Sequence, residues 1–204
     1  MKSSRNYIAF SQILFILLLN QNFYNRPTLE VARDLLGKKL VRRMDGVELS
    51  GIIVETEAYC GSGDSACHAH RGRTERNAVM FGPPGRAYVY FTYGMHYLLN
   101  LVTEKEGNPS AVLIRAIKAV SGLEEMQARR KRRGKELTNG PAKLCQALGI
   151  DKTFNGWDVT RGNQLWVENY QYANPLTISS TPRIGIDYAC KKDREALWRF
   201  LLQL

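Results

Sequence analysis

Apolar residues recur along the chain at two spacings, one typical of helices and the other of strands. Where the helical spacing appears, a start signal precedes it and a glycine or a basic run follows it. Three helices are predicted in this way: one from Pro27-Thr28 to a stop at Gly37, one that begins at the capping-box pair Ser121 and Glu124 and ends in Arg129–Arg133, and one from Asn139-Gly140-Pro141 to Gly149.

Extended segments fill most of the remaining chain. The turn pair Asp45-Gly46 joins two of them, and Tyr93-Gly94 stands near the tip of a β-hairpin. The stretch from Cys60 to Gly85 is rich in Gly, Ser, His and Arg and is predicted to be a loop. The predicted strands are Lys39–Arg43, Val47–Tyr59, Ala87–Tyr93, Tyr97–Thr103, Ser110–Ala116, Leu165–Val167, Pro182–Ile186 and Trp198–Phe200.

The order of these elements predicts one domain. The chain has 204 residues, enough to bury a core, and contains no internal repeat, linker or low-complexity tract. We therefore expect a single α+β domain with a mostly antiparallel curved sheet, flanking helices and a protruding β-hairpin. Residues 23–204 are expected to form this domain, and residues 1–22 an apolar N-terminal extension.

Charge and cysteine content narrow the class of partner. With 29 Lys and Arg residues against 19 Asp and Glu residues, the formal net charge is +10. Such an excess favours a polyanionic partner, either nucleic acid or an anionic membrane, although many basic proteins merely carry solvated lysines. The four cysteines form no Cys-x-x-Cys pair, and the spacing Cys60…Cys67-His68 matches no common zinc pattern. We expect reduced thiols and no metal.

The segment Val54–Tyr59 carries two carboxylates on a predicted strand. Because side chains alternate along a strand, Glu55, Glu57 and Tyr59 share one side. Two carboxylates beside an aromatic ring are costly unless they are paired, hydrated or used in chemistry. A solvated acidic face is the alternative interpretation.

The predicted hairpin concentrates tyrosines, and a loop before it concentrates basic residues. Tyr88 and Tyr97 are expected to fill the sheet core, whereas Tyr93, at the tip, has little core to fill and suits insertion between base pairs. The loop His68–Asn77 offers arginines for phosphates and imidazoles for a flipped base, or is simply an exposed basic loop. The run Arg129–Arg133 is given only a supporting role on phosphates.

Four motifs follow one another along the chain: Ile53–Tyr59, Arg76–Phe81, Tyr88–Tyr97 and Asn139–Leu144. Together, in this order, they resemble the alkyladenine (3-methyladenine) DNA glycosylase family, and the resemblance runs from about Pro27 to Phe200. The resemblance implies a monofunctional glycosylase that flips an alkylated or deaminated purine from duplex DNA and hydrolyses its bond to the sugar. It also implies that the enzyme needs no metal or organic cofactor. The expected partner is double-stranded DNA containing damaged purines, and the protein is expected to be a monomer.

The resemblance also assigns eight residues to the reaction. Three hold or activate the attacking water, three enclose the flipped base, one fills the gap that the base leaves, and one helps to exclude guanine. In that order they are Glu57, which deprotonates the water, with Arg115 and the carbonyl of Ile184; Tyr59 and His68, with Tyr90 on the opposite face; Tyr93, the intercalating wedge; and Asn100, against the purine edge.

Both ends of the chain depart from the family pattern. The apolar run Tyr7–Leu19 is too short for a transmembrane helix, which needs about 20 apolar residues, and it lacks the cleavage site of a signal peptide. It is interpreted as a segment packed on the domain, an export signal or an extension outside the fold, and the first and third suit an intracellular DNA enzyme. The chain ends four residues after Phe200, so we expect a shortened C-terminal edge.

Three other functions fit parts of the sequence. A bifunctional glycosylase/lyase would use a lysine nucleophile such as Lys143, which would have to lose its proton. A non-catalytic nucleic-acid-binding module would use the tyrosines for stacking but leaves Glu57 unexplained. A membrane-attached basic protein rests only on Tyr7–Leu19 and the net charge.

Overall fold

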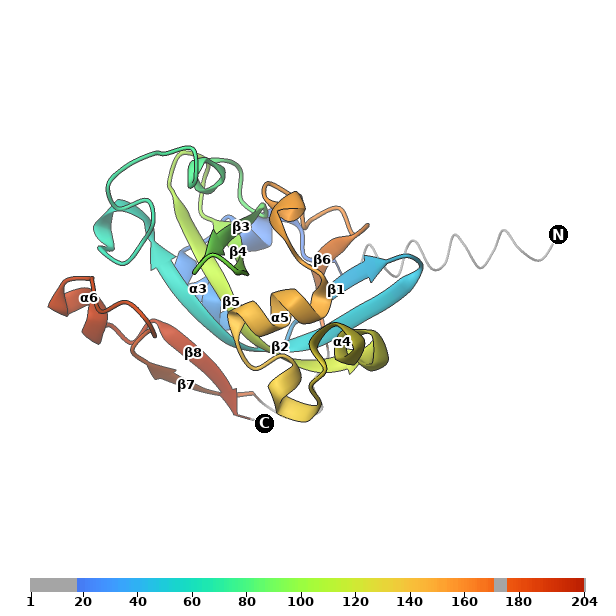
Figure 1. The fold of residues 1–204 in the computed structure, drawn as a ribbon. Helices are drawn as coiled ribbons and strands as arrows, with labels where there is room; N and C mark the ends of the chain where they lie inside the picture. The colour runs from blue at the N-terminus through green and yellow to red at the C-terminus, as the bar shows by residue number, and fades with distance from the viewer. Residues whose placement is uncertain (1–17, 171–175, 204) are drawn as a thin grey trace.

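The computed structural model describes residues 18–170 and 176–203, which form the single α+β domain that the sequence predicts (Figure 1). Its strands pair antiparallel in an open sheet, and α-helices flank the sheet. In the described residues the strands are β1 Lys39–Met44, β2 Val47–Cys60, β3 Ala87–Thr92, β4 His96–Thr103, β5 Ser110–Ser121, β6 Leu165–Glu168, β7 Thr177–Thr181 and β8 Arg199–Gln203. The α-helices are α2 Gln21–Tyr24, α3 Thr28–Asp34, α4 Leu123–Arg130, α5 Pro141–Leu148 and α6 Lys191–Glu195.

The long strand β2 organises the sheet, whose main path runs β3-β4-β5-β2-β1-β6. One edge of β2 pairs with β5, whereas the other pairs with β1 in its first half and with β8 from Glu55 to Glu57. The pairing with β5 is irregular around Glu55, close to where the other edge of β2 passes from β1 to β8. Irregularities of this kind bend a strand and redirect its side chains, and they occur often beside active sites.

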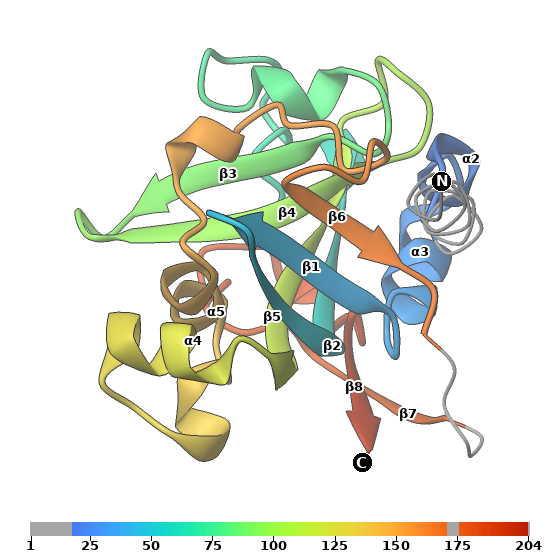
Figure 2. The same ribbon diagram turned by 90° about the vertical axis from the view of Figure 1, so that its right-hand side faces the viewer.

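Helices cover the sheet on two sides. Figure 2 shows α2 and α3 to the right of the sheet and α4 and α5 at its lower left. The main core joins buried residues of α3, such as Val31, to residues of α5, such as Leu144, and to strand residues such as Ile53. Helix α5 begins at Pro141 and stops at its C-cap Gly149, as predicted, and this glycine has a left-handed φ of 61°. The β3–β4 hairpin extends beyond the body of the domain (Figure 2).

Two sequence predictions are wrong. Ser121 does not cap α4: it is the last residue of β5, its hydroxyl lies 2.7 Å from that of Ser50, and Gly122 precedes the helix with a φ of 72°. A side chain at Gly122 would collide with Leu49, so long-range strand pairing overrides the capping pattern. The segment 182–186 is a loop that follows β7, and the strand lies at Thr177–Thr181 instead.

The end of the apolar N-terminal run packs on the domain. Leu18 forms a β-bridge with Glu168, and the Leu19 amide donates to the Val167 carbonyl at 3.0 Å. Leu19 is buried. The rest of the Tyr7–Leu19 run lies outside the described residues. Within residues 18–170 and 176–203, no helix combines the length and apolar character needed to cross a membrane.

Candidate active site

A cavity of about 310 Å³ opens beside the β3–β4 hairpin. Its walls come from strands β2 to β5, the loop between β2 and β3, the start of α5 and the loop after β7. This volume lies at the lower end of the range for small-molecule pockets. The lining residues are Tyr59, Ala66, His68, Arg76, Met80, Tyr88, Tyr90, Thr92, Tyr93, Leu98, Asn100, Ala111, Leu113, Arg115, Pro141, Ile184, Gly185, Ile186 and Tyr188.

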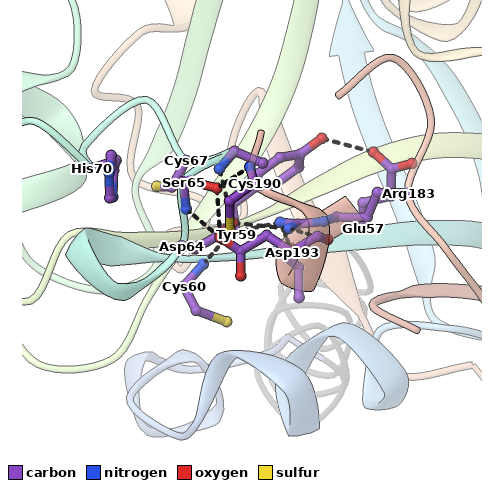
Figure 3. Close-up of polar contacts among 12 residues, drawn as sticks. Glu57, Tyr59, Cys60, Asp64, Ser65, Cys67, His70, Arg183, Cys190 and Asp193 are labelled. Atoms are coloured by element: carbon purple, nitrogen blue, oxygen red, sulfur yellow. Dashed lines mark hydrogen bonds and ion pairs between the residues drawn. The ribbon is translucent and has the colours of Figure 1, made fainter. Parts of the chain in front are cut away.

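Glu57 lies fully buried beneath this lining, with both carboxylate oxygens engaged. The Tyr59 hydroxyl donates to Oε2 at 2.9 Å, and Arg115 Nη1 donates to the same oxygen at 3.1 Å. The backbone N–H of Ile184 donates to Oε1 at 2.8 Å. Figure 3 shows the Tyr59 hydroxyl directed at the carboxylate. These donors hold the carboxylate in one orientation.

The neighbouring carboxylate completes a charge network. Arg115 Nε donates to Glu55 Oε1 at 2.8 Å, and Arg199 Nε donates to the same oxygen at 2.6 Å. Glu55 and Glu57 therefore share Arg115, as expected for residues on one side of a strand. Glu55 and Glu57 therefore do not form a solvated acidic face. Their two negative charges are paired with the guanidinium groups of Arg115 and Arg199.

Aromatic rings form the walls above the carboxylate. The rings of His68 and Tyr90 lie 4.6 Å apart, and Nδ1 of His68 lies 2.9 Å from the Tyr88 hydroxyl. Burial and the nearby charge of Arg76 lower the pKa of His68 to about 4, so this imidazole is neutral at pH 7. Burial, and then the Glu57 carboxylate, raise the pKa of Tyr59, which keeps its hydroxyl a donor.

Asn100 and Tyr93 are both on the hairpin but differ in burial. Asn100 is buried, and its Nδ2 donates to the Tyr88 carbonyl at 3.1 Å on the adjacent strand. Tyr93 is 84% exposed at the tip, with a φ of 51°, and Gly94 follows it with a φ of 67°. Tyr88 is buried in the sheet, as predicted, yet its hydroxyl reaches His68.

All the residues that the sequence assigns to the site gather here, and several others join them. Arg76 stacks over the ring of Tyr90 at 5.1 Å, and Tyr188 anchors its hydroxyl on the Ala66 carbonyl at 2.9 Å. Arg76 lies within a motif of the resemblance, which was the available signal. No motif in the sequence pointed to Tyr188, which follows a segment that was predicted to be a strand.

Lys143, the nucleophile of the lyase alternative, does not line this cavity. Its Nζ donates to Glu136 and to Asn139, at 2.8 Å each, and its side chain is 36% exposed. Its amine is held by a carboxylate and an amide outside the cavity, so the structure gives the lyase alternative no support. Within residues 18–170 and 176–203, no cluster of three or more His, Cys, Asp or Glu side chains could hold a metal ion.

Comparisons with known proteins identify the family of this chain. The family model described as methylpurine-DNA glycosylase matches residues 22–204. A relative from Methanocella arvoryzae is 51% identical, covering 90% of this chain and 91% of its own. One from Alkaliphilus oremlandii is 48% identical, covering 91% and 95%. Both carry the name "Putative 3-methyladenine DNA glycosylase". The chain belongs to the methylpurine-DNA glycosylase family and is a DNA glycosylase, a hydrolase of N-glycosyl bonds.

Proposed function

We propose that this glycosylase flips alkylated or deaminated purines, of the 3-methyladenine, hypoxanthine and ethenoadenine type, out of duplex DNA and hydrolyses their bond to deoxyribose. The observation that carries the proposal is the buried Glu57 carboxylate beneath an aromatic cavity. As the purine leaves, positive charge develops on the sugar, and a fixed carboxylate stabilises it. The product is an abasic site.

Glu57 is proposed to act also as the general base. It takes a proton from a water whose oxygen forms a bond to the sugar carbon C1′, while the bond from C1′ to the purine nitrogen breaks and its electron pair leaves with the base. Arg115 and the Ile184 carbonyl hold this water. A cationic purine such as 3-methyladenine becomes neutral on leaving, so it needs no acid.

The walls are proposed to select the base. Tyr59 and His68 enclose the flipped purine, with Tyr90 on its opposite face. Tyrosine rings attract a cationic purine, and a neutral His68 does not repel it. Asn100 lies against the purine edge where guanine carries its amino group. Tyr93 fills the space left in the duplex.

We propose that the enzyme works inside the cell, as a monomer with DNA as its partner and without a stable membrane partner. The net charge of +10 supports binding to a polyanion.

The test is incubation of the purified protein with duplex oligonucleotides that carry hypoxanthine, ethenoadenine or 7-methylguanine. Abasic sites are scored by strand cleavage in alkali, and undamaged duplex is the control. We expect cleavage at the damaged purines only. Absence of abasic sites with all these substrates would reject the proposal, and trapping of a covalent adduct by borohydride would replace it with the lyase mechanism.

A further inference from the structure

A buried ion pair between Arg183 and Asp64 lies next to Tyr59, whose hydroxyl donates to Glu57 (Figure 3). Arg183 Nη1 lies 2.5 Å from Asp64 Oδ2, and Nη2 lies 2.8 Å from Oδ1, with both side chains fully buried. Neither residue lines the cavity. Desolvation makes such pairs costly, and apolar side chains often replace them without loss of stability. A contribution to folding stability alone is therefore a weak explanation for the presence of this ion pair.

The pair fixes two loops against the end of β2. Arg183 Nη1 also donates to the Ala58 carbonyl at 2.9 Å, which attaches the loop after β7 to that strand. Asp64 accepts hydrogen bonds from the backbone N–H groups of Cys60, at 3.1 Å, and Ala66, at 3.0 Å. These bonds shape the loop that leads to His68.

Two routes lead from Arg183 to the Glu57 carboxylate, one to each oxygen. The next residue, Ile184, donates its N–H to Oε1 at 2.8 Å, although it lies in an irregular loop and is 49% exposed. The guanidinium group of Arg183 also lies 4.8 Å from the centre of the Tyr59 ring, whose hydroxyl donates to Oε2. An exposed Ile184 side chain cannot anchor its own amide, so the anchor is Arg183.

We propose that Arg183 and Asp64 form a positioning pair that orients the Glu57 carboxylate through the Ile184 amide and the Tyr59 hydroxyl. The pair touches neither the DNA nor the attacking water. The inference rests on the proposed role of Glu57. Displacement of a reacting group by about 1 Å can cost about 100-fold in rate, so a small shift of the loop is enough to matter.

The first test compares excision and binding in Arg183→Lys and Asp64→Asn. Lysine keeps the charge of Arg183 but loses the paired hydrogen bonds and the flat face against Tyr59, and asparagine nearly preserves the volume of Asp64. We expect single-turnover excision of hypoxanthine to fall about 10- to 100-fold. Affinity for a duplex with an uncharged tetrahydrofuran abasic analogue should change little, because the residues that face the DNA remain.

A second measurement reports on the carboxylate itself. A duplex with a cationic pyrrolidine at the abasic position imitates the charge of the transition state, so wild type should bind it more tightly than the uncharged analogue. Both variants should lose this preference. A merely structural role would weaken the binding of both analogues equally.

The matched control is Lys39→Met, which breaks the 2.7 Å ion pair between Lys39 and Glu168, on β1 and β6 at the other end of the sheet path. It should lower stability and leave both the excision rate and the preference for the cationic analogue unchanged. Wild-type excision by Arg183→Lys and Asp64→Asn, or equal weakening of both analogues, would overturn the positioning role. If wild type excises no damaged purine, the proposed function fails, and the inference fails with it.

Discussion

The conformation of Tyr93 predicts a conflict between stability and activity. Its φ of 51° lies in the left-handed region, which costs a residue with a side chain of order 1–2 kcal/mol, and which asparagine adopts much more readily than tyrosine. Tyr93 is 84% exposed, so packing offsets little of this cost. We expect Tyr93→Asn to raise the free energy of unfolding by about 0.5–1 kcal/mol, because the turn geometry needs a positive φ at this position.

Calorimetry and excision assays should move in opposite directions. In a chain of 204 residues this gain corresponds to a rise of about 1–4 °C in Tm. If the ring fills the gap left by the flipped base, the variant loses a stacking interaction worth about 1–3 kcal/mol. Single-turnover excision of hypoxanthine from duplex DNA should then fall about 10- to 100-fold.

The chain contains a matched control for this turn. Asp45 has a φ of 50° and precedes Gly46, at 81°, in the β1–β2 hairpin. Asp45→Tyr should lower the free energy of unfolding by a similar amount and leave excision unchanged. A lower Tm in Tyr93→Asn would show that the ring packs on the fold and refute the strain argument. A higher Tm with unchanged excision would reject the wedge.

Three further predictions concern the cavity. Glu57→Gln should reduce single-turnover excision by about 1,000-fold or more while lesion binding persists, and Glu55→Gln should cost much less, because it acts only through Arg115; near-normal turnover of the first variant would reject its role. Asn100→Ser should raise the ratio of 7-methylguanine to hypoxanthine excision about tenfold, and a constant ratio would assign guanine exclusion elsewhere. His68 should make folding less favourable as the pH falls from about 6.5, its unfolded pKa, to about 4, its folded pKa, because only the unfolded chain then binds the proton. In urea titrations at pH 7 and 4.5, His68→Gln should therefore lose less stability than wild type, and equal losses would contradict this.

Local chemistry in the sequence determined the hairpins and the orientation of the acidic strand. Asp45-Gly46 and Tyr93-Gly94 supply the positive φ angles that tight turns need, and both turns form where predicted. The two-residue period of a strand places Glu55 and Glu57 on one side, where Arg115 joins them. The two turns and the shared side of the two carboxylates depend on neighbouring residues alone, whereas the contact with Arg115 does not.

The resemblance named eight residues that meet at the cavity, but the sequence did not reveal how they are held. The partners of Glu57 at Arg115 and Ile184 lie 58 and 127 positions away in the chain, and no local spacing encodes such contacts. In the sequence Arg183 and Asp64 look like ordinary surface charges. They become a buried pair only when the loop after β7 folds against the end of β2.

The same long-range pairing decided the two errors. Ser121 lies in β5 because β5 continues along β2, and residues 182–186 form a loop because Arg183 turns inward to Asp64. The sequence by itself determined the turns, the alternation of faces and the chemical groups of the site. Tertiary structure decided their burial, their partners and their orientation, because these depend on which distant segments meet.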